Sequence, residues 1–230
     1  MWLTWNQLPK DMQTEDVRPY YDVLNARRGS LLAKRVFDFS LAILLLVLLS
    51  PLWLVCALWI KLDSKGPVFF RQERVTTYGK LFKIHKFRTM VTGADKQGSQ
   101  ITVNHDSRVT RAGAFLRKYK LDEIPQLLDI LAGNMSFVGT RPEVLKYVQK
   151  YTPAMKATLL LPAGITSEAS IRYKDEEKLL NAADNVDEVY VKSVLPGKMK
   201  WNLESITRFS FLREILTMFR TIFVVLGKDF

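Results

Sequence analysis

Two adjacent carboxylates, Asp122 and Glu123, are the side chains of this sequence best suited to chemistry. Pro125 follows them, and its fixed backbone angle suits the first turn of a helix, so we expect both acids at the positive end of a helix. Basic residues before and after the pair are Lys86, Arg88, Arg111, Arg117 and Arg141. Because arginine presents a planar fork to phosphate oxygens, the combination predicts a site for a phosphorylated substrate.

The two acids are expected to have different tasks, because adjacent side chains point in different directions. One could attack phosphorus or bind Mg²⁺, which proteins commonly hold through one or two carboxylates plus substrate phosphates. The other could complete the metal site or move a proton. The alternative is that Asp122 and Glu123 only cap a helix, as acids near helix starts often do.

Other phosphate and metal motifs are absent from the sequence. It has no G-x-x-x-x-G-K-[ST] loop, no G-x-G-x-x-G turn and no zinc-type spacing of cysteine and histidine. His85 and His105 have no companion ligand at metal-binding spacing, so we expect neither to be catalytic. The predicted phosphate chemistry therefore differs from that of standard NTPases and dinucleotide enzymes.

The long apolar segment Val36–Ile60 is the element that would position such a site at a membrane. Its length suffices to cross a bilayer, which takes about 20 apolar residues. Pro51 cannot donate a backbone hydrogen bond and crowds the carbonyl of Val47, so we expect a kink at Ser50–Pro51. The Ser50 hydroxyl could satisfy a backbone group that the kink exposes.

Positive charge flanks this segment on both sides, and positive residues favour the cytoplasmic face. We therefore favour a re-entrant hairpin that enters, bends and returns, over a bitopic anchor or a buried pair of core helices. Asp38 is costly in lipid, so it is expected near the interface and paired with Lys34 or Arg35.

The whole chain is basic, with a formal net charge of +11 and a pI near 9.7, so its partners are expected to be anionic. The single cysteine, Cys56, excludes an internal disulfide framework. Short strands are expected on both sides of Thr76–Gly79. We expect an N-terminal arm over residues 1–33, the membrane hairpin over 34–61, a catalytic domain over 62–208, and an amphipathic helix over 209–230 that is interfacial or packed on the domain.

Several ordered blocks of this sequence resemble the bacterial sugar transferases, the monotopic polyprenyl-phosphate phosphoglycosyl transferases. The matching blocks are Lys34–Phe39, Ser50–Pro51, Gly66–Arg74, Lys86–Met90, Leu121–Leu127 and Gly133–Pro142. The resemblance implies a mostly helical α/β fold with a small β element, held on the cytoplasmic face of the bacterial inner membrane by a re-entrant helix.

The same resemblance implies a two-step reaction that begins surface glycan assembly. A carboxylate attacks a UDP-sugar, releases UMP and holds a covalent phospho-sugar, which polyprenyl phosphate then accepts. Asp122 matches the nucleophile and Glu123 its partner, with Mg²⁺ as cofactor held by this pair. The candidate contacts to substrate and phosphate are Lys86, Arg88, Arg111, Arg117, Arg141, Pro142 and Arg172.

The sequence also departs from the family pattern. Pro162–Arg172 differs from the usual run, and Thr140 stands where many members have proline. The large N-terminal region of longer members has no counterpart, so the chain resembles the minimal catalytic form. Membrane lipids are expected partners, a homodimer stays open, and nucleic acid is not expected. The competing hypotheses are a membrane-tethered nucleic-acid-binding module and a scaffold without catalysis.

Overall fold

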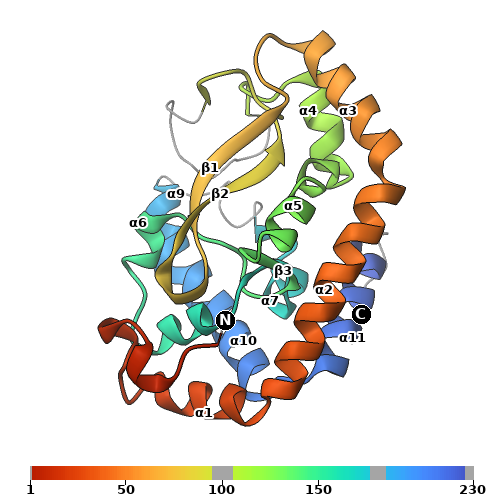
Figure 1. Ribbon diagram of the computed structural model, residues 1–230. Coiled ribbons are helices and arrows are strands. Elements are labelled where there is room, and N and C mark those ends of the chain that lie inside the picture. The colour runs from red at the N-terminus through yellow and green to blue at the C-terminus, as the bar shows by residue number, and fades with distance from the viewer. Residues whose placement is uncertain (1, 95–105, 177–184, 226–230) are drawn as a thin grey trace.

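The computed structural model describes residues 2–94, 106–176 and 185–225 of the chain. Helices make up most of it, and two small sheets complete the α/β fold predicted from the sequence (Figure 1). The main elements are α1 (Arg18–Ala26), α2 (Arg28–Leu48), α3 (Ser50–Asp63), β1 (Phe69–Val75), β2 (Leu81–Phe87), α4 (Arg111–Lys118), α5 (Gln126–Leu131), β3 (Met135–Val138), α6 (Leu145–Val148), β4 (Ala163–Thr166), α7 (Glu168–Arg172), α9 (Val186–Val189), α10 (Leu195–Thr207) and α11 (Phe211–Val225).

The first sheet is the antiparallel pair of β1 and β2, which confirms the two strands predicted around Thr76–Gly79. Tyr78 and Gly79 both have positive φ, so the chain reverses tightly between the strands. Phe70 pairs with Lys86 across the ladder. Because side chains alternate between the faces of a strand, Arg74 lies on the same face as Phe70 and Lys86.

The second sheet joins β3 and β4 in parallel, with Met135 opposite Ala163. A Cβ added to Gly164 would lie 2.2 Å from the backbone nitrogen of Gly139, so glycine permits the two segments to touch. The last residues of β3 lead directly to Arg141. This sheet therefore fixes the course of the chain toward one of the predicted phosphate contacts.

The apolar segment is a broken helix, as predicted: α2 ends at Leu48, and α3 begins at Ser50 with a bend of 63° between them. The Ser50 hydroxyl donates to the Val47 carbonyl at 2.8 Å, which satisfies the acceptor that Pro51 leaves open. No single described helix is long and apolar enough to cross a bilayer, whereas α2 and α3 together pass on length and composition. The two halves diverge along one side of the molecule and do not lie antiparallel (Figure 1).

Asp38 lies inside the protein, and its expected depth near a bilayer interface stays a prediction. It is 2% exposed and accepts a 2.7 Å hydrogen bond from the Ser136 hydroxyl of β3. Lys34 lies 3.7 Å from it, the pairing expected from the sequence, and is 2.6 Å from Glu214 of α11. Charged groups removed from water need such partners. This ionic cluster connects α2, β3 and α11.

The C-terminal helix α11 packs on the domain, one of the two positions expected for it, and its position at a membrane interface stays a prediction. One edge packs on α2, where Phe211 meets Phe37 and Glu214 meets Lys34. Its opposite side exposes an apolar stripe, formed by Leu212, Leu216, Phe219 and Phe223. These residues recur at helical spacing, which gives the helix one continuous apolar face.

The N-terminal segment before α2 is part of the packed core. Leu8, Met12 and Leu24 are buried against Ile206 and Phe209 at the end of α10. Arg27 also donates to the Phe209 carbonyl. The arm predicted over residues 1–33 therefore contains a layer that wraps α10 and leads directly into α2.

Replacing Lys34 by methionine should destabilise the protein by about 3–5 kcal/mol, because Asp38 and Glu214 would stay buried without their shared cation. Arg18→Met is the matched control, since Arg18 and Asp22 form a pair whose side chains are 48% and 54% exposed. That pair should contribute less than about 1 kcal/mol. Denaturant unfolding in detergent measures both, and equal losses in the two variants would contradict the role given to Lys34.

Candidate active site

A cavity of about 530 Å³ lies beside the β1–β2 sheet and contains Asp122. Phe69, Phe70 and Phe87 contribute apolar wall, while Asp122 is the only carboxylate among the described lining residues. Six cationic side chains also line it: Arg71, Arg74, Lys86, Arg88, Arg108 and Arg117. A cavity of this charge favours a ligand with several negative charges and an apolar or aromatic portion.

The acid pair occupies a 3-10 turn, Leu121–Glu123, and not the start of the helix as predicted. The α5 helix begins only at Gln126 and is six residues long. Lys120 enters the turn with φ 56°, a left-handed conformation that few non-glycine residues adopt. The two acids then point differently, as expected: Asp122 lines the cavity, and Glu123 meets Lys86 and Arg141.

Glu123 is held by two cations from distant parts of the chain. Lys86 Nζ lies 3.0 Å from Glu123 Oε1, and the Arg141 guanidinium bonds both Glu123 oxygens. Burial by itself would raise the pKa of Glu123, but the charges and hydrogen bonds of Arg141 and Lys86 outweigh burial and hold it far below its ordinary value. Glu123 is therefore ionised at neutral pH, and its two ion pairs order the site.

Asp122 has the opposite electrostatic situation. Its side chain is buried, and within the described parts of the chain no hydrogen bond reaches its carboxylate. Burial raises the pKa of Asp122 above its ordinary value, the Lys86 charge opposes this, and the Glu123 charge adds to it. A carboxylate with uncommitted oxygens facing a cationic cavity can attack an electrophile or bind a metal.

Arg117 lines the cavity, whereas Pro142 does not line it and is connected to it through Arg74. Arg117 lines the cavity and donates from Nε to the Thr89 hydroxyl at 2.8 Å. The close approach of α4 needs Gly113, because a Cβ there would lie 2.0 Å from the Thr89 carbonyl oxygen. Pro142 contributes its carbonyl, which accepts a hydrogen bond from Arg74 at 3.1 Å.

Of three further predicted contacts, one lines the cavity with a structural role as well, and two lie away from it. Arg88 borders the cavity, but its terminal nitrogens donate to the carbonyls of Ile60, Ser64 and Lys65, so it caps the end of α3. Arg111 is exposed at the start of α4 and does not line the cavity. Arg172 pairs with Glu168 at 2.9 Å and lines a separate cavity, so the structure does not bring it to Asp122.

Arg74 is a site residue that the sequence analysis did not identify. Its terminal nitrogens reach Pro142 and Gln72, and its buried Nε has no partner among the described residues. The signal was available in the strand pattern, because Arg74 and Phe70 share a face of β1 and Phe70 pairs with Lys86. Arg71 and Arg108 also line the cavity without having been predicted.

The predicted metal site stays a prediction. Within the described residues, no group of three or more histidine, cysteine, aspartate or glutamate side chains could hold a metal ion. Glu123 already has Lys86 and Arg141 as partners, while the oxygens of Asp122 are uncommitted. The residues present thus fit an ion that one carboxylate shares with substrate phosphates, as is usual for Mg²⁺.

A family model described as bacterial sugar transferase matches residues 29–228 of this chain. A UDP-glucose:undecaprenyl-phosphate glucose-1-phosphate transferase of Escherichia coli (strain K12) is 36% identical over 219 residues, covering 93% of this chain and 44% of that protein. A putative undecaprenyl-phosphate N-acetylgalactosaminyl 1-phosphate transferase of Bacillus subtilis (strain 168) is 39% identical over 146 residues, covering 63% of this chain and 80% of that protein.

A third relative, a UDP-N-acetylgalactosamine-undecaprenyl-phosphate N-acetylgalactosaminephosphotransferase of Aeromonas hydrophila, is 33% identical over 84% of this chain and 43% of that protein. The chain therefore spans less than half the length of two of these relatives.

Asp122→Asn and Glu123→Gln should change stability in opposite directions at pH 7. The raised pKa of Asp122 means that its ionised form destabilises the folded protein, so the asparagine variant should be at least as stable, an advantage that disappears as the pH falls through that pKa. The lowered pKa of Glu123 means that its carboxylate stabilises the fold above the unfolded-state pKa, so the glutamine variant should lose roughly 3 kcal/mol.

Denaturant unfolding in detergent measures both effects between about pH 4, near the ordinary pKa of a carboxyl group, and about pH 8. The deficit of Glu123→Gln should shrink as the pH is lowered. If Asp122→Asn lost as much stability as Glu123→Gln at pH 7, the opposite pKa shifts assigned to the two acids would be contradicted.

Proposed function

The chain belongs to the bacterial sugar transferase family, and on that basis we propose that it transfers a sugar 1-phosphate from a UDP-sugar to polyprenyl phosphate, with release of UMP. The observation that carries the proposal is Asp122, a buried carboxylate without a hydrogen-bond partner among the described residues, in a cavity lined by six cations. A structural helix cap would not need an uncommitted carboxylate surrounded by arginines. The cations match the charge of a diphosphate.

In the first step, an ionised Asp122 oxygen attacks the β-phosphorus of the UDP-sugar. The bond from that phosphorus to the bridging oxygen breaks, UMP leaves with the bridging oxygen, and the sugar phosphate stays on Asp122 as an acyl phosphate. Lys86 and Arg117, which line the cavity, stabilise the charge on the phosphoryl oxygens. Phe69 and Phe70 offer apolar surface for the uracil or the sugar.

In the second step, a phosphate oxygen of polyprenyl phosphate attacks the same phosphorus. The bond to Asp122 breaks, the carboxylate is regenerated, and polyprenyl diphospho-sugar leaves. Glu123 stays ionised between Lys86 and Arg141 and fixes the turn that carries Asp122. Its function in this scheme is positioning, because both of its oxygens are engaged by cations.

A magnesium ion would be held by Asp122 and substrate phosphate oxygens, with Glu123 next to it. Its contribution would be to neutralise the negative charge of the diphosphate as the nucleophile approaches. The support for it is the uncommitted carboxylate of Asp122, together with the general preference of Mg²⁺ for few protein oxygens and several phosphate oxygens.

We place the bent helix in the cytoplasmic leaflet of the bacterial inner membrane, with the catalytic domain on the cytoplasmic face. Val47, Leu48 and Leu54 near the bend are exposed, and the 63° angle lets both ends face the same side. If the two helices tilt equally, the 14 residues of α3 descend only about 11 Å, at about 1.5 Å per residue. The bend would then stay within a hydrocarbon core roughly 30 Å thick.

The nucleic-acid hypothesis has less support than the transferase hypothesis. Nucleic-acid binding without sequence preference needs exposed aromatic platforms beside a cationic groove. Here Phe87 is buried, and the cations surround Asp122 and Glu123, which would repel a phosphate backbone. The scaffold hypothesis leaves the cationic cavity without a purpose.

Asp122→Asn should lower UMP release from a UDP-sugar by at least about 10⁴-fold, because the amide cannot form the acyl phosphate. Its membrane binding and folding should be unchanged. Asp22→Asn, an exposed carboxylate on α1, is the matched control and should retain full turnover. Incubation with Mg²⁺, polyprenyl phosphate and a panel of UDP-sugars, with UMP as readout, measures the loss, and normal turnover in Asp122→Asn would exclude it as the nucleophile.

Single cysteines on the two sides of the bent helix should both react from the cytoplasmic side only. Arg28→Cys and Lys65→Cys replace exposed residues, the first of α2 and one just after α3, and are tested in a Cys56→Ala background. A membrane-impermeant maleimide should label both in inverted vesicles and neither in intact spheroplasts. Labelling of one position in spheroplasts would favour a bitopic anchor.

A further inference from the structure

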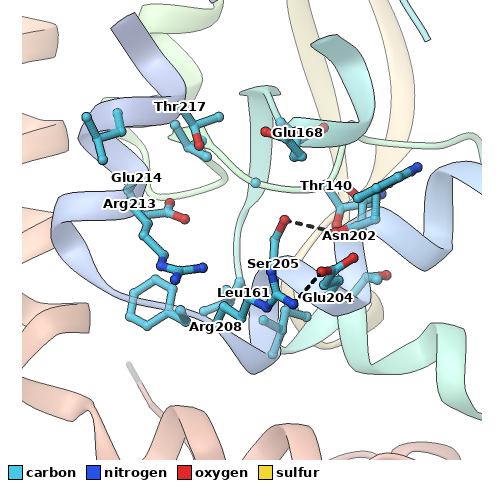
Figure 2. Close-up of a pocket in the computed structure, with 18 of the residues that line it drawn as sticks. Thr140, Leu161, Glu168, Asn202, Glu204, Ser205, Arg208, Arg213, Glu214 and Thr217 are labelled. Carbon is cyan, nitrogen blue, oxygen red and sulfur yellow. Dashed lines mark hydrogen bonds and ion pairs between the residues drawn. The ribbon is translucent and has the colours of Figure 1, made fainter. Parts of the chain in front are cut away.

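A second cavity, of about 450 Å³, lies between α7, α10, α11 and the end of β3 (Figure 2). None of its lining residues lines the cavity of Asp122. Its apolar lining comes from Val138, Leu161, Ile206 and Phe209. Arginine side chains also border it: Arg172, Arg208, Arg213 and Arg220. We call it the α11 cavity.

Positive charge in the α11 cavity exceeds the carboxylates available to it. Glu168 is shared by Arg172 at 2.9 Å and Arg220 at 2.7 Å. Glu204 pairs with Arg208, and Glu214 is occupied by Lys34.

Arg213 is the border cation without a carboxylate partner in the described part of the chain. Figure 2 shows its side chain extending from α11 toward Arg208. The local excess of charge predicts an anionic ligand.

The orientation of α11 indicates whether this anionic ligand comes from a bilayer or from solution. Its polar side faces the protein, where Thr221 bonds Thr166 at 2.8 Å and Arg220 bonds Glu168. Its apolar stripe faces outward, with Leu212 71% exposed and Leu216 59% exposed. A helix with this arrangement is suited to lie in a bilayer interface, where its cationic border residues meet lipid phosphates.

We propose that the α11 cavity binds one anionic phospholipid of the phosphatidylglycerol type, separately from the substrates of Asp122. Arg213 and Arg208 hold the lipid phosphate, and the apolar lining around Leu161 and Phe209 receives the glycerol backbone and the first part of an acyl chain. This proposal rests on the membrane placement given above. The bound lipid would fix α11 and, through the Lys34–Glu214 ion pair, the start of α2.

The test measures lipid binding by the full-length protein in detergent, without UDP-sugar. Titration with phosphatidylglycerol should give saturable binding of one lipid by native mass spectrometry, with a rise in melting temperature. Phosphatidylcholine should bind at least about 10-fold more weakly, since each factor of ten corresponds to about 1.4 kcal/mol. Arg213→Gln should weaken phosphatidylglycerol binding about 10-fold, within the usual value of a charged hydrogen bond.

Arg28→Gln is the matched control, because it removes the same charge from an exposed position at the start of α2 and should bind lipid normally. Melting without added lipid checks that both variants fold. Equal binding of phosphatidylcholine, or normal binding by Arg213→Gln, would overturn the proposal. Competition by inorganic phosphate or glycerol phosphate at the same concentration as the lipid would also overturn it, because the ligand of the α11 cavity would then be a free phosphate.

UMP release separates this proposal from the proposed function. Loss of specific lipid binding with UMP release intact would reject only the α11 cavity as a lipid site. Specific lipid binding without UMP release would support the α11 cavity and reject only the transferase mechanism at Asp122.

Discussion

The ion pairs of Glu123 with Lys86 and Arg141 are the constraint on which the geometry of the site depends. They join β2, the acidic turn and the segment after β3, three parts of the chain that have no local reason to meet. Because Glu123 stays ionised, the two cations remain in place and the neighbouring Asp122 is turned toward the cavity. The ion pairs of Glu123 stabilise the folded protein and offset the free-energy cost of burying the Asp122 carboxylate. The raised pKa of Asp122 reflects that cost. The two acids therefore differ in what they contact: Glu123 joins three parts of the chain, and Asp122 faces the cavity.

Both halves of the bent apolar helix are connected to this site by polar contacts. Asp38 of α2 accepts a hydrogen bond from Ser136, and β3 continues from there to Arg141. The end of α3 is capped by Arg88, which borders the cavity of Asp122. In the proposed membrane position, these contacts would fix the height of Asp122 above the bilayer and thus its reach to a lipid phosphate. The same hydrogen bond explains why Asp38 occurs inside an apolar sequence: its side chain faces the protein interior.

The two cavities use arginine in different ways. Around Asp122 the cations surround one carboxylate, which in the proposed function suits a ligand that exchanges a phosphoryl group. In the α11 cavity the arginines border apolar lining beneath a helix with an exposed apolar stripe, which suits a ligand that is held and not transformed. Arg172 illustrates the distinction, since the sequence placed it with the substrate contacts, and the structure stacks it on Trp201 at 3.7 Å beside Glu168. The sequence predicted that Arg172 contacts the substrate of Asp122, whereas the structure places it at the other cavity.

Local patterns in the sequence determined the broken helix and the β1–β2 pair, because proline geometry and strand alternation are properties of short segments. They also selected Asp122 and Glu123 as candidates, because acids among cations can be recognised locally. Contacts between distant residues were beyond such patterns. The sequence did not show that Arg88, which lines the cavity, also caps the end of α3, or that Asp38 bonds Ser136 of β3. Only the fold brings Arg74 to the site and decides that Glu123 is held by two cations. The physical reason is that burial and charge pairing depend on which distant side chains share a volume, and the spacing of residues along the chain does not specify that.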